Sequence, residues 1–372
     1  MTRRIRVGVL FGGRSGEHAV SLMSARSIIA ALRPEKYEVV PIGITTDGRW
    51  LVGGDPLAVL AGTEKAAKQT VHAVLRPDAS KGQLIQLDGG EQLLEAIEPI
   101  DVFFPVLHGT YGEDGCIQGL FELADVPYVG SGVAASAVGM DKVLMKAVFR
   151  AAGLPILRYR VVKRRDFKED PERAAAEAAD EIGFPCFVKP ACLGSSVGIS
   201  KAKNMQELLE GLQTAARYDR KLLVEEAAVD CREVEVSVLG NDEPVPSIPG
   251  EIVPSNEFYD YKAKYLDDRS ELHIPARIAA PTTVKVMELA VRAFKAIDAA
   301  GLARVDFFVK KDGSAVFVNE VNTMPGFTHI SMYPKLWEAS GLPFSQLVDR
   351  LIELAFERYA DEAESQRTYE GE

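Results

Sequence analysis

Residues 304–322 read RVDFFVKKDGSAVFVNEVN, and this stretch indicates the fold most directly. Arg304–Val309 and Ala315–Asn322 are predicted strands, and Asp312-Gly313 between them is a strong signal for a tight hairpin turn. Because side chains alternate along a strand, Arg304 and Asp306 share one face, and Glu320 and Asn322 likewise share a face.

If the two strands pair, Asp306, Glu320 and Asn322 converge beside Arg304. Two carboxylates and an amide oxygen suit a hard cation, and few protein ligands suit Mg²⁺ completed by water and phosphate. Arg304 could then stabilise charge on a transferring phosphoryl group. Taken alone, the same residues could also form a solvated charged face of an antiparallel sheet.

A strand and a long loop precede this hairpin. Glu233–Leu239 alternates valines with Glu233, Glu235 and Ser237, which predicts a half-buried antiparallel strand with a polar face. The loop 255–270 carries FYDYKAKY at residues 258–265. A loop of this length is either a lid that closes over a site or a flexible surface insertion. A helix is predicted over Thr282–Ala300.

The middle of the chain holds a possible phosphate-binding loop. Lys189 ends a predicted strand, Cys186–Pro190, and the glycine/serine loop Leu193–Gly198 follows it. Backbone N–H groups and hydroxyls of such a loop can donate to a triphosphate, and the lysine adds a charge. This is not a Walker A loop, because the order GxxxxGK(S/T) is absent. Lys142 is a second possible phosphate lysine; a plain turn and a helix-surface charge are the alternatives.

The other elements predicted in this block are a helix around Ser136–Ala152, a helix from about Asn204 to Ala216, and the strand Lys221–Glu226.

The first third alternates strands with helices, which predicts an open α/β sheet with its site at the carboxyl ends of the strands. The predicted strands are Ile5–Phe11, Tyr37–Ile44 and Asp101–Leu107. FGGRSGEH at residues 11–18 is not a dinucleotide fingerprint, because its glycines do not read GxGxxG. Glu17 is either a charge at a helix start or a group that captures a substrate ammonium. The loop His108–Gly115 lies at the end of a strand.

Composition excludes several classes of function. The chain has 372 residues and a formal net charge of −11, and Lys163-Arg164-Arg165, the one basic run, reads as a solvated loop, so no nucleic acid is expected. No run of about 18 apolar residues is present, so no membrane span is expected. The N-terminus lacks a signal-peptide core and the four cysteines lack CxxC spacing, which together predict a cytoplasmic protein without disulfides or zinc.

Seven motifs in order resemble those of the D-alanine–D-alanine ligase family, which has the ATP-grasp fold. They are GGRSGEH, HGTYGEDG, GMDK, KP with GSSVG, FYDYKAKY, RVD and NEVNTMPGFT, and they run from about Gly8 to beyond Ser331. The resemblance implies ATP-dependent joining of two D-alanines for peptidoglycan precursors. It implies an N-terminal substrate domain (1–135), a central ATP-grasp subdomain (136–226) and a C-terminal subdomain with the metal site and lid (227–372).

The resemblance also implies roles for individual residues. Glu17 would hold the ammonium of the first D-alanine, with Ser195 and Tyr265 as its hydrogen-bonded partners and His108 in the substrate pocket. Arg304 would stabilise the tetrahedral and phosphoryl charge, and Gly326 with Ser331 would anchor the second carboxylate.

The cofactors implied are ATP and Mg²⁺ or Mn²⁺, two ions to a site. The metal ligands would be Asp306, Glu320 and Asn322. The residues around ATP would be Lys142, Lys189, Ser196, Glu225, Glu226, Ala228, Glu233, Lys264 and Asn319. Glu225 is preferred over Glu226 to face the adenine. A homodimer is implied by the resemblance alone.

Three other functions compete with this hypothesis. A D-alanine–D-lactate ligase would replace the tyrosine stretch of the lid, which here is of the dipeptide-forming type. A nucleotide-binding dehydrogenase would use the N-terminal sheet but would leave the metal residues unexplained. A non-catalytic ATP-binding module would need a broken metal trio.

Overall fold

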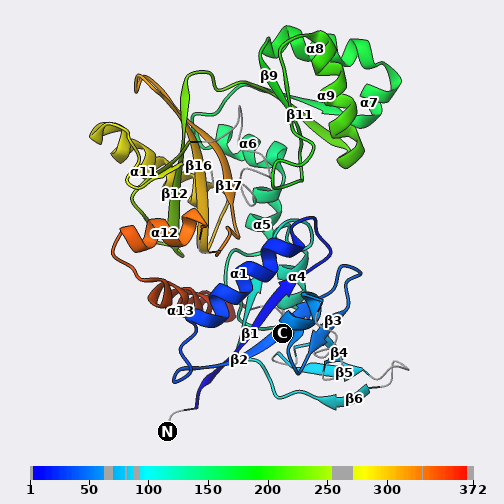
Figure 1. Cartoon of the computed structure of the whole chain (residues 1–372), viewed down its shortest axis with the longest axis vertical. Coiled ribbons are helices and arrows are strands. Elements are labelled where there is room, and N and C mark those ends of the chain that lie inside the picture. The colour runs from blue at the N-terminus through cyan, green and yellow to red at the C-terminus, as the bar shows by residue number, and fades with distance from the viewer. Residues whose placement is uncertain are drawn as a thin grey trace, which may run out of the picture.

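The structure is a computed structural model that describes residues 3–62, 70–79, 82–87, 93–253, 271–328 and 330–366. Within these residues the strands form three sheets, each with helices packed on it (Figure 1). The α/β class predicted from the sequence is confirmed. No helix within these ranges is long and apolar enough to cross a membrane.

The N-terminal sheet combines a parallel core with an antiparallel extension. β1 (Ile5–Gly12) pairs in parallel with β2 (Tyr37–Ile44) and β7 (Val102–Val106), as an open α/β sheet should. The extension lies beyond β2 and contains β3 (Trp50–Val52), β4 (Val71–Leu75), β5 (Leu84–Leu87) and β6 (Leu93–Ala96). The short helix α2 (Pro56–Leu60) joins β3 to this part of the chain.

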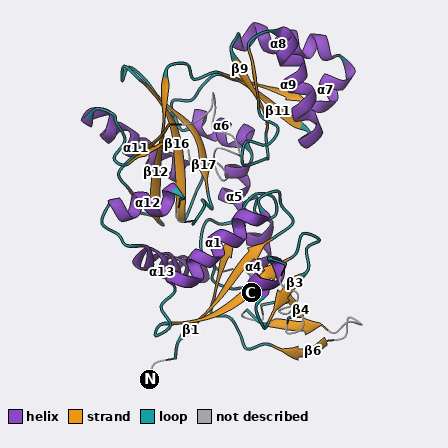
Figure 2. Ribbon diagram, in the orientation of Figure 1, coloured by secondary structure: helices purple, strands orange, loops and turns teal. Residues whose placement is uncertain are grey.

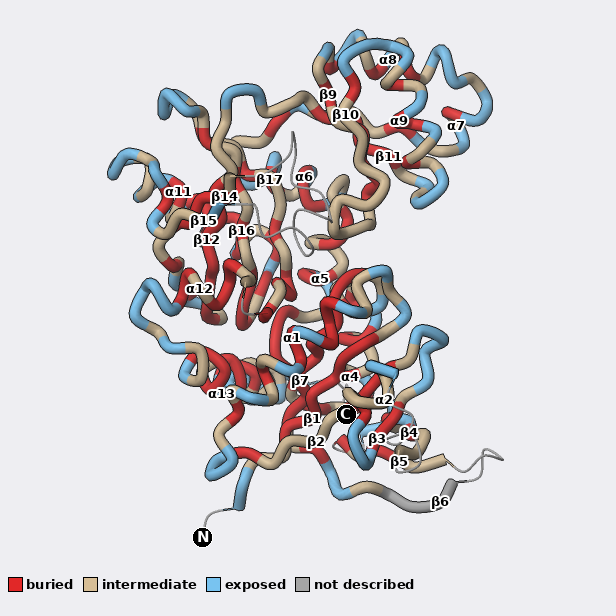
Figure 3. The backbone as a smooth tube through the Cα atoms, in the orientation of Figure 1, coloured by how far each residue is buried: buried red, intermediate tan, exposed pale blue. Residues whose placement is uncertain are grey.

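Helices cover both faces of this sheet. On one face, Val102, Phe104 and Val106 of β7 pack with α1 (His18–Ala31) and α13 (Phe344–Ala363). On the other face, Phe103 stacks on Phe121 of α4 (Cys116–Ala124), with 4.9 Å between ring centroids. The central strands are therefore buried on both sides, as the red tube of Figure 3 shows for β1 and β7.

The middle sheet is small and carries its helices on one side (Figure 2). Its strands, in the order β10-β9-β11-β8, are β8 (Tyr159–Lys163), β9 (Cys186–Pro190), β10 (Ser200–Ala202) and β11 (Lys221–Glu226). Its helices are α7 (Arg164–Glu169), α8 (Pro171–Ile182) and α9 (Met205–Tyr218). Both β9 and β11 have the predicted bounds. The side chain of Asn204 caps α9 by accepting a bond from the Glu207 N–H.

The single helix predicted around 136–152 is wrong. Two helices occupy this region, α5 (Val133–Met140) and α6 (Lys142–Ala151), and Asp141 separates them. Its carboxylate accepts the backbone N–H groups of Val143 and Leu144 and pairs with Lys221. Asp141 therefore starts a new helix in a new direction, with Lys142 as its first residue.

The C-terminal sheet packs one face on α11 (Ala280–Ala296) and turns the other face toward the middle sheet. Its strands are β12 (Cys231–Gly240), β13 (Val245–Pro246), β14 (Gly250–Val253), β15 (Glu271–His273), β16 (Gly301–Lys310) and β17 (Val316–Asn322). Helix α12 (Met332–Ala339) follows β17.

The prediction that Glu233–Leu239 is half-buried is only partly right. Val234, Val236 and Val238 face α11, but Glu235 and Ser237 on the opposite face are 6% and 0% exposed. The Ser237 hydroxyl donates to the carbonyl of Tyr333, because α12 covers this part of the second face.

A β-bulge in the hairpin of β16 and β17 sets which side chains face away from α11. Asp306 pairs with Glu320, whereas the next residue, Phe307, pairs with Val318, so Asn319 is the extra residue. Val316 and Val318 therefore pack into the core before the bulge and Val321 after it. This change of phase puts Glu320 and Asn322 on the same face as Asp306.

Candidate active site

Two adjoining cavities lie where the three sheets meet. The smaller, about 130 Å³, is lined by residues that follow or belong to all three sheets. The larger, about 340 Å³, lies between the middle and C-terminal sheets. Five residues line both cavities and form a shared wall: Lys142, Ser196, Ile199, Glu235 and Glu320. A ligand in one cavity could therefore react with a ligand in the other.

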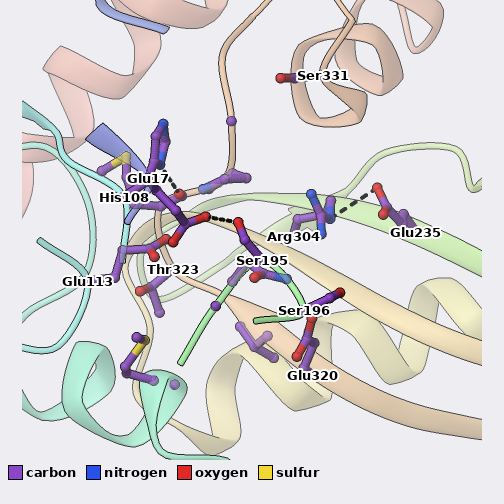
Figure 4. A pocket seen from close by; sticks show the side chains of 18 of the residues that line it. Glu17, His108, Glu113, Ser195, Ser196, Glu235, Arg304, Glu320, Thr323 and Ser331 are labelled. Atoms are coloured by element: carbon purple, nitrogen blue, oxygen red, sulfur yellow. Dashed lines mark hydrogen bonds and ion pairs between the residues drawn. The ribbon is translucent and has the colours of Figure 1, made fainter. Parts of the chain in front are cut away.

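Glu17 is the point in the smaller cavity where the N-terminal and middle parts of the chain meet. It stands just before α1, and its carboxylate accepts a hydrogen bond from the Ser195 hydroxyl (Figure 4). Ser195 and Ser196 have φ angles of 50° and 59°, a region that residues other than glycine rarely adopt. Strain of this kind clusters at binding sites, which agrees with the position of this loop.

His108 forms hydrogen bonds with two residues that are far apart in the sequence, Ser24 and Met324. It is 4% exposed, its Nε2 lies 3.0 Å from the Ser24 hydroxyl, and its Nδ1 lies 3.1 Å from the carbonyl of Met324. The carbonyl can only accept, so Nδ1 carries the proton and Nε2 accepts from Ser24. Burial lowers the pKa of His108, which keeps the ring neutral.

Glu113 is a cavity residue that was not predicted from the sequence, although it belongs to the loop His108–Gly115. Its carboxyl accepts the Gly109 N–H at 2.7 Å and lines the smaller cavity near Glu17. Burial raises the pKa of Glu113 well above its usual range, and the charge of Glu17 adds to the rise. The smaller cavity thus holds, beside Glu17, a carboxyl group that retains its proton more strongly than usual.

Arg304 is fixed by two carboxylates. It donates to both oxygens of Asp306 at 2.7 Å, and its Nε lies 3.0 Å from Glu235. Figure 4 shows Arg304 reaching toward Glu235, on the side of the cavity that Ser331 also faces. Glu235, Asp306 and Glu320 stand opposite one another on β12, β16 and β17. The sequence placed Glu235 on a polar face but did not single it out.

Of the three residues predicted to hold magnesium, Asp306 and Glu320 lie on this row, and Asn322 lies next to it, opposite Arg304. Asn322 Nδ2 donates to Asp306 at 3.0 Å, and the Lys142 ammonium lies 3.6 Å from Glu320. Across the described ranges, no three His, Cys, Asp or Glu side chains form a metal-binding group. The set is instead two carboxylates and an amide, and this all-oxygen chemistry fits a cation that completes its shell with water and phosphate.

The larger cavity contains lysines and carboxylates of the middle sheet. Lys189 donates to Glu225 at 2.6 Å, and both line the cavity. Glu226 also lines it but is bound to Arg158, through the backbone N–H at 2.9 Å and Nε at 2.8 Å. The two adjacent glutamates therefore have different partners, and Glu225 is the one that faces a lysine of the site.

The predicted residues fall into the two cavities. The smaller is lined by Glu17, His108, Lys142, Ser195, Ser196, Arg304, Glu320, Asn322, Gly326 and Ser331. The larger adds Lys189, Glu225, Glu226, Ala228, Glu233, Asp306 and Asn319. Lys264 and Tyr265, in the predicted lid, lie outside the described residues.

Comparison with known proteins agrees with this geometry. The family model for the D-ala D-ala ligase N-terminus matches residues 6–131, and that for the C-terminus matches residues 148–353. The chain belongs to the D-alanine–D-alanine ligase family. The resemblance of the seven motifs is thereby confirmed, as is the ATP-grasp fold that it implied.

Two relatives of the family match over nearly their whole length. The D-alanine–D-alanine ligase of Natranaerobius thermophilus is 51% identical over 96% of this chain and 96% of its own. That of Heliobacterium modesticaldum is 52% identical over 95% of each chain. The chain is thus a ligase of this family, and the dehydrogenase alternative is not supported.

Two solved structures of the family superpose well. The D-alanine–D-alanine ligase of Coxiella burnetii has a TM-score of 0.83 at 38% identity, covering 97% of this chain and 96% of that one. The VanG D-Ala:D-Ser ligase of Enterococcus faecalis also has a TM-score of 0.83, at 36% identity, covering 95% of this chain and 100% of that one. The fold therefore serves ligases that differ in their second amino acid.

Proposed function

We propose that the chain joins two D-alanines into D-alanyl-D-alanine, with ATP converted to ADP and phosphate, to supply peptidoglycan precursors. The observation that carries this proposal is the shared wall of the two cavities. The larger cavity has the room and the lysines for a nucleotide, and the smaller has separate groups for an ammonium and for a carboxylate. Lys142 and Glu320 belong to both, so a phosphoryl group can pass between them.

The first D-alanine would bind with its ammonium on Glu17. The Glu17 carboxylate is the negative group nearest the Ser195 loop, and Ser195 already donates to it. An ion pair in such a cavity is worth more than one in water. His108 would stay neutral and orient the backbone around the substrate rather than repel its ammonium.

The second D-alanine would place its carboxylate at Arg304 and at the turn that contains Gly326 and Ser331. The Ser331 hydroxyl accepts the Thr328 N–H at 3.0 Å, which fixes its position. A Cβ on Gly326 would lie 2.7 Å from this hydroxyl, so a side chain there would displace it. The guanidinium of Arg304 would supply the positive charge.

ATP would occupy the larger cavity, with Lys142 and Lys189 on its phosphates and Glu225 toward the adenine. Glu233, Ala228 and Asn319 line the same cavity. Glu226, bound to Arg158, would shape the rim instead. The backbone of the Ser195–Ser196 loop would cover the phosphates.

Asp306, Glu320 and Asn322 would hold Mg²⁺ or Mn²⁺, one or two ions. Bound there, the metal would supply positive charge to the phosphate oxygens during transfer. Asp306 would then have to bind both the cation and Arg304. Both of its oxygens accept hydrogen bonds from Arg304.

The chemistry proceeds in two displacements. A carboxylate oxygen of the first D-alanine attacks the γ-phosphorus of ATP, ADP leaves, and an acyl phosphate forms. The neutral amine of the second D-alanine attacks the acyl carbon, and phosphate leaves with the bridging oxygen. Lys142 and Arg304 balance the negative charge that develops at each stage.

Substrate dependence of phosphate release tests this proposal. Release from ATP and Mg²⁺ should require D-alanine and should not occur with L-alanine alone. D-serine and D-lactate are added as second substrates, because the VanG relative is named as a D-Ala:D-Ser ligase. If phosphate release requires D-serine, the protein would instead join D-alanine to D-serine. Phosphate release with D-lactate would favour the depsipeptide-forming alternative.

We also propose a cytoplasmic location and a homodimer. ATP as co-substrate and four cysteines without a disulfide agree with the location. The dimer rests on the resemblance and is tested by the molar mass in solution, where a monomer would contradict it. The domain boundaries after residues 135 and 226 likewise stay a proposal.

A further inference from the structure

A buried carboxylate at the back of the larger cavity is held between two lysines. Glu225 accepts a hydrogen bond from Lys189 at 2.6 Å through one oxygen, and its other oxygen is paired with Lys146. The side chains of Lys146 and Glu225 are 1% and 2% exposed, and that of Lys189 is 11% exposed. Three charges therefore share a site that water hardly reaches.

The two lysines differ in their access to the cavity. Lys189, on β9, lines the cavity together with Glu225 of β11. Lys146, on α6, does not line it and lies behind the carboxylate, with its ammonium 5.9 Å from the centre of the Tyr159 ring. One lysine can thus reach a ligand, and the other cannot.

The pKa shifts agree with an ionised Glu225 and a charged Lys189, whereas the pKa of Lys146 is lowered. Burial alone would raise the pKa of Glu225, but Lys146 and Lys189 outweigh it and lower that pKa, so the carboxylate is ionised. Burial lowers the pKa of Lys146, and Glu225 opposes this effect. The pKa of Lys189 is raised in spite of its burial, because Glu225 stabilises its charge.

The trio contains two lysines and one carboxylate, and the carboxylates of Glu233 and Glu320 act on its lysines from farther away. If Lys189 and Glu225 were alone, moving Lys189 onto a phosphate would leave a buried carboxylate without a counter-charge, which is strongly unfavourable. With Lys146 in place, Glu225 keeps a partner whichever way Lys189 turns.

We propose that Lys146 is a positioning residue for nucleotide binding, which neutralises Glu225 from behind and so releases Lys189 to the phosphates of ATP. The proposal rests on the assignment of the larger cavity to the nucleotide. It gives Lys146 no contact with substrate, so its effect should be on nucleotide affinity and not on amino-acid binding.

Lys146→Met tests this, because methionine fills a similar volume without the charge. The KM for ATP and the Kd for MgADP should rise by about ten-fold or more, the scale of a lost bond to a charged group. The KM for D-alanine should change by less than two-fold. Lys168→Met, on an exposed face of α7, is the matched control and should equal the wild type.

A double variant separates the charge effect from simple packing damage. Lys146→Met should weaken MgADP binding less in the Glu225→Gln background than in the wild type, because no buried carboxylate is then left without a partner; the comparison with Glu225→Gln alone removes any contact that Glu225 itself makes with the adenine. Equal weakening by Lys146→Met in both backgrounds would make Lys146 a packing residue and overturn the proposal. So would wild-type MgADP affinity in Lys146→Met.

The wild type is measured first. If the wild-type protein, folded by circular dichroism, does not bind MgADP at all, the nucleotide assignment of the cavity fails. If the wild type binds and the variants behave alike, only the role of Lys146 fails.

Discussion

At the scale of single residues, the Glu17 carboxylate leaves no room for a side chain at two neighbouring glycines. A Cβ on Gly109 would lie 2.6 Å from the Glu17 carboxylate, and one on Gly194 would lie 2.9 Å from it. Gly109 also has a φ of 76°, which disfavours any other residue. Two glycines from distant motifs thus make room for one carboxylate, and this explains why both motifs need glycine at these positions.

Ser195→Ala should weaken binding of the first D-alanine. It removes one hydrogen bond to a charged group, worth about 1.5–3 kcal/mol, so the KM for that site should rise roughly 10-fold or more. The KM for ATP should change little. Ser27→Ala, on a partly exposed position of α1, is the control. Unchanged affinity for D-alanine in Ser195→Ala would show that this contact does not serve the substrate.

Glu320→Gln should remove turnover without unfolding the protein. The change deletes one of two carboxylates on the proposed metal face, and loss of such an electrostatic group costs about 10²–10³ in kcat. Phosphate release measured across a Mg²⁺ titration checks this, with the exposed Glu338→Gln as control. An active Glu320→Gln enzyme with normal Mg²⁺ dependence would contradict the metal assignment.

His108 should make stability depend on pH. Its folded-state pKa is lowered by burial, below the value of about 6.5 expected in the unfolded chain. As the pH falls below about 6.5, the unfolded chain binds a proton that the folded one refuses, so stability is lost toward pH 5.

Urea midpoints at pH 7, 6 and 5 measure this loss. His108→Gln removes the titrating group, and its midpoint should fall less over the same interval than that of the wild type. Parallel falls in the two proteins would mean that His108 does not contribute to the dependence.

The sequence could name most of the charged site residues but few of their partners; Ser195, implied by the resemblance as a partner of Glu17, does donate to that carboxylate. Glu17, Arg304, Asp306 and Glu320 were found because they sit in motifs. Lys146 and Glu235 were missed, because a buried charge needs partners from distant segments, and a single sequence does not display those contacts.

Among secondary-structure elements, the hairpin of β16 and β17 determines the site. If Asn319 were paired like its neighbours instead of forming the bulge, regular alternation would turn Glu320 and Asn322 into the core with Val318. The change of phase is visible in the sequence, because the core residues of β17 are Val316, Val318 and Val321. The convergence predicted from this hairpin is therefore correct, but it depends on a bulge that was not predicted.

The predicted bounds of helices and strands were wrong where the local sequence signal was weak. Strands β2, β9 and β11 have the predicted bounds, because apolar runs bounded by turns define them well. The break at Asp141 was missed although Gly139 lies just before it, because a single glycine within an apolar helical pattern does not by itself end a helix. It depends on the cap that Asp141 gives α6 and on its pairing with Lys221 from another strand.

Across the whole molecule, the C-terminal helix closes the chain onto the N-terminal sheet. Asp349 of α13 pairs with Arg33 and with Lys36, the latter at 2.9 Å, although more than 310 residues separate them. Its side chain is 8% exposed. Figure 1 shows α13 and α1 side by side on this sheet. A sequence reading cannot foresee such a contact, because helix periodicity does not say what a helix packs against.

Asp349→Ala should therefore destabilise the protein. It leaves two cations without their partner, and because both are partly exposed the loss should be about 1 kcal/mol or slightly more. Thermal unfolding measures this, with Glu353→Ala on an exposed position of the same helix as control. A midpoint equal to that of the control would mean that this link contributes nothing.

The most direct test of the whole reaction follows oxygen atoms. The enzyme is incubated with ATP, Mg²⁺ and D-alanine in which both carboxylate oxygens are ¹⁸O. The masses of the products are then measured by mass spectrometry. An acyl phosphate intermediate predicts D-alanyl-D-alanine with three labelled oxygens and phosphate with one. Unlabelled phosphate, or phosphate release without the dipeptide, would contradict ligation of two D-alanines at this site.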